Sequence, residues 1–339
     1  MLIVMFDALD GTILHALQLW PRVPFRVIAD TVGAPEQTVA RRYHRLRRDG
    51  VLRVVGVVDP QLHGDARWLV RVHAKPDDLA RLAEALVRRD DVTHANILSG
   101  WSELVCVVRA PLGEGSDGLL RRLPRTTSVL DMEIDLVLHT FEESGTAPWT
   151  AYGHTLDAEQ VDRLLQRLAA ETPPAVRPTA PSAEDQPLLD ALAMDGRAPH
   201  ARLAELTGWS TARVTRRLSA LQAAGTLTYD VDVLPERLGF HVNAIIWVTT
   251  APRHLNDVGR ELARHAEIAS VSAKTGRNHL MAVAICRDVE HLYRYLADEL
   301  GAVEHLQSYD TSVRTQRLKQ SASLVSHGRL VAAVSPAQR

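Results

Sequence analysis

The chain of 339 residues contains 39 Lys and Arg against 41 Asp and Glu, a formal net charge of -2 at pH 7, and 46 % hydrophobic residues. This length allows two or more domains with separate cores, and this composition is ordinary for a soluble globular protein. The start, MLIVMFDALDG, lacks a basic region and is too short for a signal peptide or membrane span, so we expect a cytoplasmic protein.

The cysteine and histidine content argues against metal and redox chemistry. Cys106 and Cys286 each lie in an apolar segment typical of a buried strand. Two distant thiols make neither a disulfide framework nor a metal motif, and the 15 histidines lack metal-ligand spacing. The sequence also lacks a P-loop and a nucleophile elbow. We therefore expect no enzyme, no catalytic residue, no metal and no cofactor.

Residues 1–58 are predicted to form a helix-turn-helix head. The expected elements are helices over residues 7–20, 26–31 and 36–48 and a strand over residues 51–58. Gly33 lies in the turn between the second and third helices, where a left-handed backbone favours glycine. Val39, Tyr43 and Leu46 recur at helical spacing in the third helix, which indicates one buried face.

Residues 66–143 are predicted to form a first α/β sandwich. The expected elements are strands over residues 68–72, 92–98, 104–108 and 130–139, with helices over 76–89 and 119–123. The order β-α-β-β-α-β is that of the ferredoxin-like fold, a four-stranded antiparallel sheet with both helices on one face. Residues 99–103 form the turn between the two middle strands.

Residues 144–182 have a different composition and are predicted to form a linker. A helix is expected over residues 156–170, because its apolar residues recur at helical spacing. Four prolines follow and predict a stiff, extended connector: Pro173, Pro174, Pro178 and Pro181.

The head then occurs a second time, over residues 183–230. Residues 29–52 align without a gap with residues 204–227, at a shift of 175. The identical pairs are Ala29/Ala204, Gly33/Gly208, Val39/Val214, Arg41/Arg216, Arg42/Arg217, Leu46/Leu221, Gly50/Gly225 and Leu52/Leu227. The expected helices cover residues 184–194 and 211–223, with Ser210 as N-cap of the latter. Two copies in register make a chance resemblance to the motif improbable.

A second sandwich is predicted over residues 240–320, followed by a tail over residues 321–339 that frays after about Arg329. The expected elements are strands over residues 243–249, 268–273, 280–286 and within 303–315, with helices over 255–265 and 289–300. The fold class is therefore α+β: two winged or helix-turn-helix heads, each followed by a ferredoxin-like βαββαβ sandwich, in tandem.

Both long helices carry arginines and small polar residues away from their apolar face, which is typical of a helix that reads DNA. Arginine can grip phosphates or the acceptor edge of guanine bidentately. The DNA-binding candidates are Gln37, Thr38, Arg41, Arg42 and Arg45 in the first head, and Thr211, Arg213, Thr215, Arg216 and Arg217 in the second. Double-stranded DNA is therefore the expected partner.

The sequence resembles the Lrp/AsnC family, the leucine-responsive or feast/famine transcriptional regulators. The resemblance rests on DALDGTILHAL, on IADTVGAPEQTVARRYHRLRRDGVL leading into RVVGVVDP, and on sandwiches with a glycine turn between their middle strands. It covers nearly the whole chain twice, which makes the chain a tandem version. The resemblance implies that the sandwiches, called RAM domains, mediate homo-oligomerisation and bind a small-molecule effector, usually an amino acid.

By this resemblance, the effector candidates lie in the two glycine turns: Ser99, Gly100, Trp101, Ser102 and Glu103, and Thr275, Gly276, Arg277, Asn278 and His279. Many members have an aspartate just after the turn glycine and another two residues later, and both turns here depart from that pattern. Arg277 suits a ligand carboxylate and Glu103 a ligand amine. A purely structural role for these turns is the alternative.

Two other functions fit the same fold. Sirohaem decarboxylases are similar in fold and can occur as fused pairs, but they have a histidine-containing loop and a longer insertion, where this chain has His94 and a short turn. An architectural DNA-binding protein without an effector would use the same basic helices, mainly on phosphates.

Overall fold

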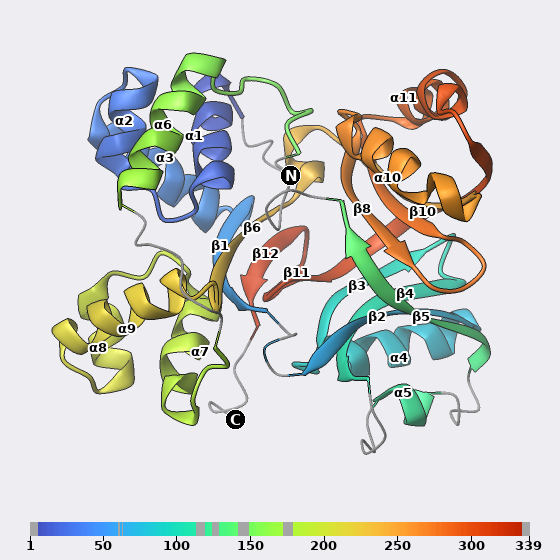
Figure 1. The fold of residues 1–339 in the computed structure, drawn as a ribbon, viewed down its shortest axis with the longest axis horizontal. Coiled ribbons are helices and arrows are strands. Elements are labelled where there is room, and N and C mark those ends of the chain that lie inside the picture. Colours follow the sequence, from blue (N-terminus) through green and yellow to red (C-terminus); the bar gives the residue numbers. More distant parts are fainter. Residues whose placement is uncertain are drawn as a thin grey trace. The chain divides into compact units, whose positions relative to one another are not determined.

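The computed structural model describes residues 6–59, 62, 64–112, 119–123, 129–141, 149–171 and 179–333 (Figure 1). The chain divides into two compact units. The first consists of Met1–His63, Gly153–Leu234 and Ser321–Arg339, and the second of Gly64–Tyr152 and Pro235–Gln320. The first unit therefore contains both heads, and the second contains both sandwiches.

The first head has three helices, α1 (Ala8–Leu19), α2 (Phe25–Val32) and α3 (Glu36–Arg48). Asp7 and Asp10 form a capping box at the start of α1, since each carboxylate accepts a hydrogen bond from the other residue's amide. Gly33 ends α2 with φ of 68°, so the left-handed backbone predicted for this turn is confirmed. Val39, Tyr43 and Leu46 are buried, so the predicted inner face of α3 is confirmed.

The second head repeats this arrangement with α7 (Gln186–Met194), α8 (His200–Thr207) and α9 (Thr211–Ala223), preceded by a short 3-10 helix over Ala183–Asp185. Gly208 ends α8 with φ of 70°. The predicted N-cap of α9 is confirmed, because the Ser210 side chain accepts a hydrogen bond from the Arg213 amide at 3.3 Å.

A two-stranded antiparallel ribbon joins the two heads. It consists of β1 (Leu52–Val58) and β6 (Leu227–Val233), paired from Leu52 opposite Val233 to Val58 opposite Leu227. Helix α6 (Ala158–Glu171) packs on the first head, where Gln160 Nε2 donates to Thr31 O at 3.0 Å. Residues 172–178, with three of the four linker prolines, lie outside the described residues.

The predicted tail contains a hairpin that the sequence did not reveal. Strands β11 (Ser323–Ser326) and β12 (Arg329–Ala332) pair with each other. Leu330 is 4 % exposed, and its amide donates to Gly50 O at 2.9 Å. The expectation of fraying after Arg329 is therefore wrong for residues 329–332, because this hairpin packs against the first head; residues 334–339 lie outside the described part.

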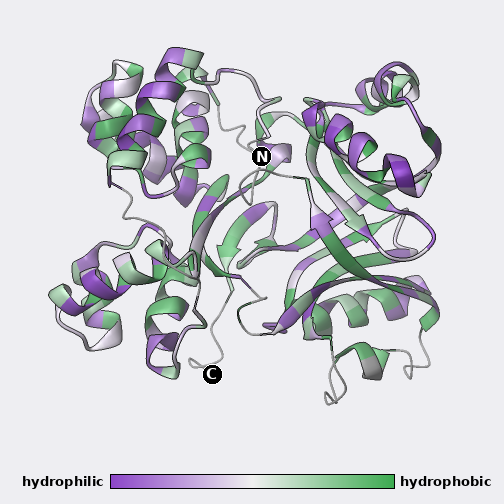
Figure 2. Cartoon of the chain, viewed as in Figure 1, coloured by the Kyte–Doolittle hydropathy of each residue, from purple (hydrophilic) through white to green (hydrophobic). Residues whose placement is uncertain are grey.

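The second unit contains two sandwiches with the same element order. The first has β2 (Asp65–Ala74), α4 (Pro76–Val87), β3 (Val92–Leu98), β4 (Glu103–Pro111), α5 (Leu119–Arg122) and β5 (Val129–Thr140). The second has β7 (Val242–Thr250), α10 (Leu255–Arg264), β8 (Ile268–Lys274), β9 (Leu280–Cys286), α11 (Val289–Arg294) and β10 (Leu306–Gln320). Helix α10 buries Val258, Gly259 and Leu262, and Figure 2 shows hydrophilic residues on its outward side. The helix predicted over 289–300 changes after α11 into a π-helical turn.

The strands of the two sandwiches form one closed ring. Their orders are β3-β4-β2-β5 and β8-β9-β7-β10, and the ring closes because β5 pairs with β8 and β10 pairs with β3. Strand β10 is longer than predicted because its first half pairs with β7 and its second half with β3. Apolar side chains of both sandwiches meet in one cluster inside this ring: Leu69, Leu98, Val105, Ile245, Trp247 and Met281.

Cys106 and Cys286 are both buried free thiols, and burial raises the pKa of each to about 12. In the described part of the chain, no helix is long and apolar enough to cross a membrane. The same residues contain no group of three or more His, Cys, Asp or Glu side chains placed to hold a metal ion.

Candidate DNA-binding and effector sites

The outward side of α3 presents a mixture of polar and charged side chains. Gln37, Arg41, His44 and Arg48 are exposed, and Thr38 is half-buried. Arg41 is two positions from both Val39 and Tyr43, so it lies on the opposite side of the helix from these buried residues. Of the predicted candidates in this head, Gln37, Thr38 and Arg41 therefore lie where a ligand outside the head could contact them.

Arg42 and Arg45, by contrast, are engaged within the head. Arg42 Nη1 lies 2.5 Å from Asp7 Oδ2 and 3.4 Å from Asp10 Oδ1, and Arg45 forms an ion pair with the same Asp10. The Asp10 side chain is fully buried. Although partial burial opposes it, hydrogen bonds from the Asp10 amide and from Arg42 hold the pKa of Asp7 below its usual range.

The second head contains the same internal ion pair. Arg217 Nε and Nη2 donate to the two carboxylate oxygens of Asp185, each at 2.5 Å, and the Asp185 side chain is 2 % exposed. The Arg217 hydrogen bonds outweigh burial and lower the pKa of Asp185 to about 2. Asp10 and Asp185 are separated by the same 175 residues as Arg42 and Arg217, so the repeat extends to this pair.

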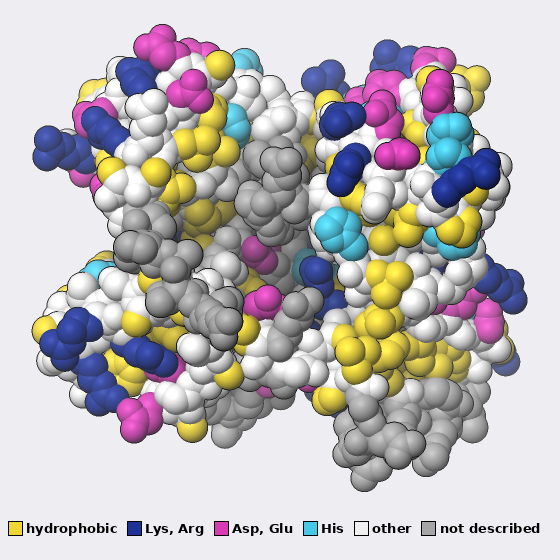
Figure 3. Space-filling view, viewed as in Figure 1, with side chains coloured by type: hydrophobic (Ala, Val, Ile, Leu, Met, Phe, Trp, Pro, Cys, Tyr) yellow, Lys and Arg dark blue, Asp and Glu magenta, His cyan; other side chains and the backbone are white. Residues whose placement is uncertain are grey.

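The outward side of α9 carries the remaining candidates of the second head. Thr211, Arg213, Thr215 and Arg216 are exposed. The Arg213 guanidinium lies 4.1 Å above the Trp209 ring and 2.8 Å from Glu184 Oε2. A cavity of about 420 Å³ lies beside these residues, and its lining includes Trp209, Arg213, Arg216 and Arg217. Figure 3 shows Lys and Arg side chains gathered over the part of the molecule that carries α8 and α9.

The two glycine turns contact the opposite sandwich. In the first turn, the Ser99 amide donates to Val313 O at 2.8 Å and the Gly100 amide to Thr315 Oγ1 at 3.1 Å. In the second turn, the Thr275 amide donates to Leu136 O at 3.0 Å. Both turns therefore help to join the sandwiches.

Both turns contain residues in the left-handed backbone region. Ser99, Gly100 and Trp101 all have positive φ, and Trp101 remains 37 % exposed. Gly276 has φ of 90°, and a Cβ atom at this position would lie 2.1 Å from Asp135 Oδ1. Gly276 therefore permits the close approach of Asp135 from the other sandwich.

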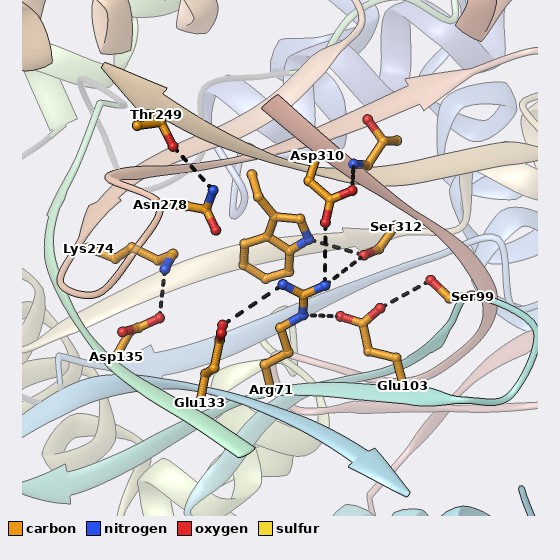
Figure 4. A network of polar contacts seen from close by, with 12 residues as sticks. Arg71, Ser99, Glu103, Glu133, Asp135, Thr249, Lys274, Asn278, Asp310 and Ser312 are labelled. Atoms are coloured by element: carbon orange, nitrogen blue, oxygen red, sulfur yellow. Dashed lines mark hydrogen bonds and ion pairs between the residues drawn. The ribbon is translucent and has the colours of Figure 1, made fainter. Parts of the chain in front are cut away.

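Glu103 belongs to a buried polar network inside the ring (Figure 4). Arg71 forms an ion pair with Glu103, which is 1 % exposed, and the Ser99 hydroxyl donates to Glu103 Oε2 at 3.1 Å. The Arg71 guanidinium lies 4.6 Å above the Trp247 ring, and Trp247 Nε1 donates to Ser312 Oγ at 3.1 Å. Glu103 is thus already paired, which leaves little scope for the ligand amine that it was expected to bind.

The other turn residues differ in their surroundings. Asn278 Nδ2 lies 3.4 Å from Thr249 Oγ1, and His279 Nδ1 accepts from the Thr250 amide at 3.3 Å. Ser102 and Arg277 are exposed. Of the two charged candidates, Arg277 and not Glu103 faces solvent.

His94 lies on β3, half-buried, with Nδ1 3.1 Å from Thr93 Oγ1. Burial and the charges of Arg317 and Arg314 lower the pKa of His94 to about 4, so its imidazole is neutral at pH 7. Sequence reasoning weighed His94 alone and missed these two arginines, because they lie more than 200 positions away on β10.

Comparisons with known proteins bear on both parts of the chain. A family model of the AsnC-type helix-turn-helix domain matches residues 6–47 and again residues 184–222, and a model of the Lrp/AsnC ligand binding domain matches residues 243–324. The family expected from the sequence motifs is thereby confirmed, including the repetition of the head.

Two curated relatives each match less than half of this chain. The chain is 27 % identical over 136 residues to the HTH-type transcriptional regulator LrpA of Pyrococcus abyssi, which covers 40 % of this chain and 96 % of that protein. It is 23 % identical over 141 residues to the HTH-type transcriptional regulator FL11 of Pyrococcus furiosus, an alignment that covers 41 % of this chain and 93 % of that protein.

Among solved structures, similarity in fold extends over nearly the whole chain. The sirohaem decarboxylase NirDL aligns over 93 % of each chain with a TM-score of 0.60 and 18 % sequence identity. At this identity the likeness shows a shared fold and nothing about activity. The domain models and the curated relatives agree: the chain contains two AsnC-type helix-turn-helix domains and one Lrp/AsnC ligand binding domain.

Proposed function

We propose that this protein is a sequence-specific, DNA-binding transcriptional regulator in which one chain supplies a pair of heads. The observation that carries the proposal is the repeated arginine pair. In both heads the second arginine, Arg42 or Arg217, is bound to a buried aspartate, whereas the preceding one, Arg41 or Arg216, is exposed on the same helix. The internal pair fixes the helix and leaves one arginine free for DNA.

Arg41 and Arg216 are the residues that we expect to read a base or grip a phosphate in the major groove. Gln37 and Thr38 support Arg41 in the first head, while Thr211, Arg213 and Thr215 support Arg216 in the second. Arg42, Arg45 and Arg217 position the helices instead of contacting DNA directly. This division follows from their ion pairs and exposure.

The β1–β6 ribbon supports the proposal that the two heads act together. Seven residues of each strand pair, and Arg22 Nη2 of the first head lies 3.3 Å from Ala198 O of the second. Because the heads are covalently linked but unlike in sequence, they suit an operator with two different half-sites. A perfect palindrome is not required.

We further propose that the sandwiches serve assembly and effector sensing in the cytoplasm. Leu130 and Leu138 of β5 are 67 % and 57 % exposed, which provides apolar surface for association with further copies. Arg277 is the turn residue best placed to pair with an effector carboxylate, such as that of an amino acid. An effector acts only if it prefers one arrangement of the protein, and DNA must then alter its affinity reciprocally.

The test is titration of a fluorescent duplex from the gene's own upstream region, with excess unrelated DNA and at two salt concentrations. Saturable binding that survives the competitor supports the regulator. If the excess unrelated DNA displaces the protein completely from the labelled duplex, the result supports an architectural DNA-binding protein instead. Binding should weaken steeply with salt in both cases, because phosphate contacts release counterions.

His94, together with the two arginines whose charges act on it, supports a second candidate, a sirohaem-binding or sirohaem-decarboxylating protein with the fold of NirDL. The neutral His94 beside Arg314 and Arg317 is the group that would serve such chemistry. The two functions separate in a sirohaem absorbance titration. A spectral shift without DNA binding would replace the regulator by this candidate.

A further inference from the structure

One part of the ring interior contains buried polar groups that have no hydrogen-bond partner in the described part of the chain. On β10, Ser312 and Arg314 alternate with the exposed Val313 and Thr315, and Ser312 receives the hydrogen bond from Trp247 inside the ring. Side chains alternate between the two faces of a strand, so Arg314 also points inward. Arg314 lies two residues after Ser312 on β10, and Ser312 is the residue of this strand that contacts Arg71.

The two interior arginines differ in their surroundings. Arg71 is paired with Glu103, its Nη2 lies 3.5 Å from Ser312 Oγ, and its guanidinium stacks on Trp247. Arg314, in contrast, has buried Nε and Nη1 atoms that donate to no acceptor among the described residues. Buried polar groups are almost always hydrogen-bonded, so an orphaned guanidinium indicates an absent partner.

The neighbours of Arg314 are incompletely paired as well. Arg317 Nη1 is bound to Gln320, but its Nε and Nη2 lack hydrogen bonds, and Nη2 lies 3.6 Å from Glu236 Oε1. Within the described structure, Glu236 Oε2 and Asn243 Oδ1 also accept no hydrogen bond. The Asn243 Nδ2 atom lies 3.3 Å from Glu236 Oε1, which fixes the orientation of this amide. Orphaned donors and orphaned acceptors thus occur together.

The charges of this cluster indicate the class of ligand. Arg314 and Arg317 contribute two positive charges and Glu236 one negative charge, while His94 is neutral at pH 7. The excess of one positive charge suits a single carboxylate better than a phosphate dianion, and the guanidinium fork matches a carboxylate in geometry. The acceptors on Glu236 and Asn243 suit a hydroxyl or ammonium group beside that carboxylate.

We propose that Arg314, Arg317, Glu236 and Asn243 form a binding site for a small organic acid that carries a hydrogen-bond donor next to its carboxylate. The carboxylate pairs with the two arginines, and the donor group pairs with Glu236 and Asn243. This site is separate from the two glycine turns and does not depend on DNA binding.

A buried cation without a partner destabilises the protein. Replacement of this cation in Arg314→Leu should therefore stabilise the protein when no ligand is bound. Burial and the charge of Arg317 already lower the pKa of Arg314 to about 9, which reflects that cost. In buffer without carboxylates, R314L should unfold at a temperature about 2 °C or more above that of the wild type. A matched control is R294L, at an exposed arginine of α11, which should change nothing.

Ligand addition provides the second readout. Glycolate and glycine should raise the unfolding temperature of the full-length wild type saturably, acetate less, and inorganic phosphate least. R314L should lose this response, and R294L should keep it. A lower unfolding temperature for R314L, together with a wild type that responds to none of these probes, would show that Arg314 is structural and would overturn the proposal.

Calorimetric titration of wild type with glycolate keeps the proposal testable if R314L does not fold. A saturable heat that weakens at least tenfold in Arg317→Gln supports the site. The absence of any saturable heat with glycolate and glycine overturns it. Since both experiments use the protein without DNA, failure here leaves the DNA-binding proposal intact, and failure of DNA binding leaves this site intact.

Discussion

The two heads share their scaffold and differ in the surface around it. Both place a glycine with positive φ before the long helix, and both bind the second arginine of the repeated pair to a buried aspartate. Around this common frame, the second head adds Trp209 beneath Arg213, where the first head has Ala34 and Thr38. The comparison teaches which residues of a repeat maintain the fold and which are free to specify a target.

The largest expected effect is on stability, and it differs between the heads. Arg217→Ala removes the only arginine hydrogen-bonded to Asp185 in the described structure, so it should lower the free energy of unfolding by about 2–4 kcal/mol. Arg42→Ala should cost about 1 kcal/mol, because Arg45 still pairs with Asp10. Urea unfolding of the two variants measures the difference; equal losses would contradict the account.

The next effect concerns DNA. Arg216→Ala should weaken specific binding by about 1–3 kcal/mol, roughly tenfold to a hundredfold, if the residue reads a base bidentately. Arg41→Ala should act similarly on the other half-site. Neither variant should alter the urea midpoint, since both side chains are exposed. Exposed Arg202 on α8 provides a control substitution.

A third effect depends on pH. The folded pKa of Asp185, about 2, lies below its usual 3.8, so its contribution to stability is present above about pH 4 and is lost as the pH falls towards 2. Because Arg217 is 36 % exposed, solvent screening reduces this contribution to about 1–2 kcal/mol. Unfolding experiments at pH 5, 3 and 2 should show a loss in the wild type that is absent from Asp185→Asn.

The smallest effect sharpens the difference between the heads. Trp209→Ala removes the ring under Arg213 and should weaken DNA binding by about 0.5–1 kcal/mol, because the guanidinium is then less well oriented. The loss should fall on sequences of one half-site only. A uniform loss over all sequences would mean that Trp209 supports the fold of the head.

Local patterns predicted the helices of both heads, and α3 and α9 have the predicted bounds. Hydrophobic spacing and the turn glycines are local signals, which explains this agreement. Of the β1–β6 ribbon, the sequence predicted β1 but not β6. Strand β6 was missed because its extended conformation depends on pairing with β1. The hairpin over 323–332 was missed for the same reason, because its order depends on packing against residues near Gly50.

The candidate site was predicted less well than the fold. Helical spacing placed Arg42, Arg45 and Arg217 away from the apolar face but could not show that aspartates 32 or more positions earlier bind them. One signal was available: Asp10 and Asp185 share the 175-residue shift of the arginines. No such signal marks Glu103 or Arg314. Glu103 pairs with Arg71 of the neighbouring strand β2, which only the sheet brings close, and Nε and Nη1 of Arg314 have no partner in the described structure.

The most direct test of the central claim is the affinity of the double variant Arg41→Ala, Arg216→Ala for a duplex that the wild type binds specifically, measured over a range of salt concentrations. The account predicts an affinity lower by at least about a hundredfold, a reduced salt dependence and an unchanged unfolding midpoint. Wild-type affinity in this variant would contradict it, since the exposed arginines of the two heads would then have no part in binding DNA.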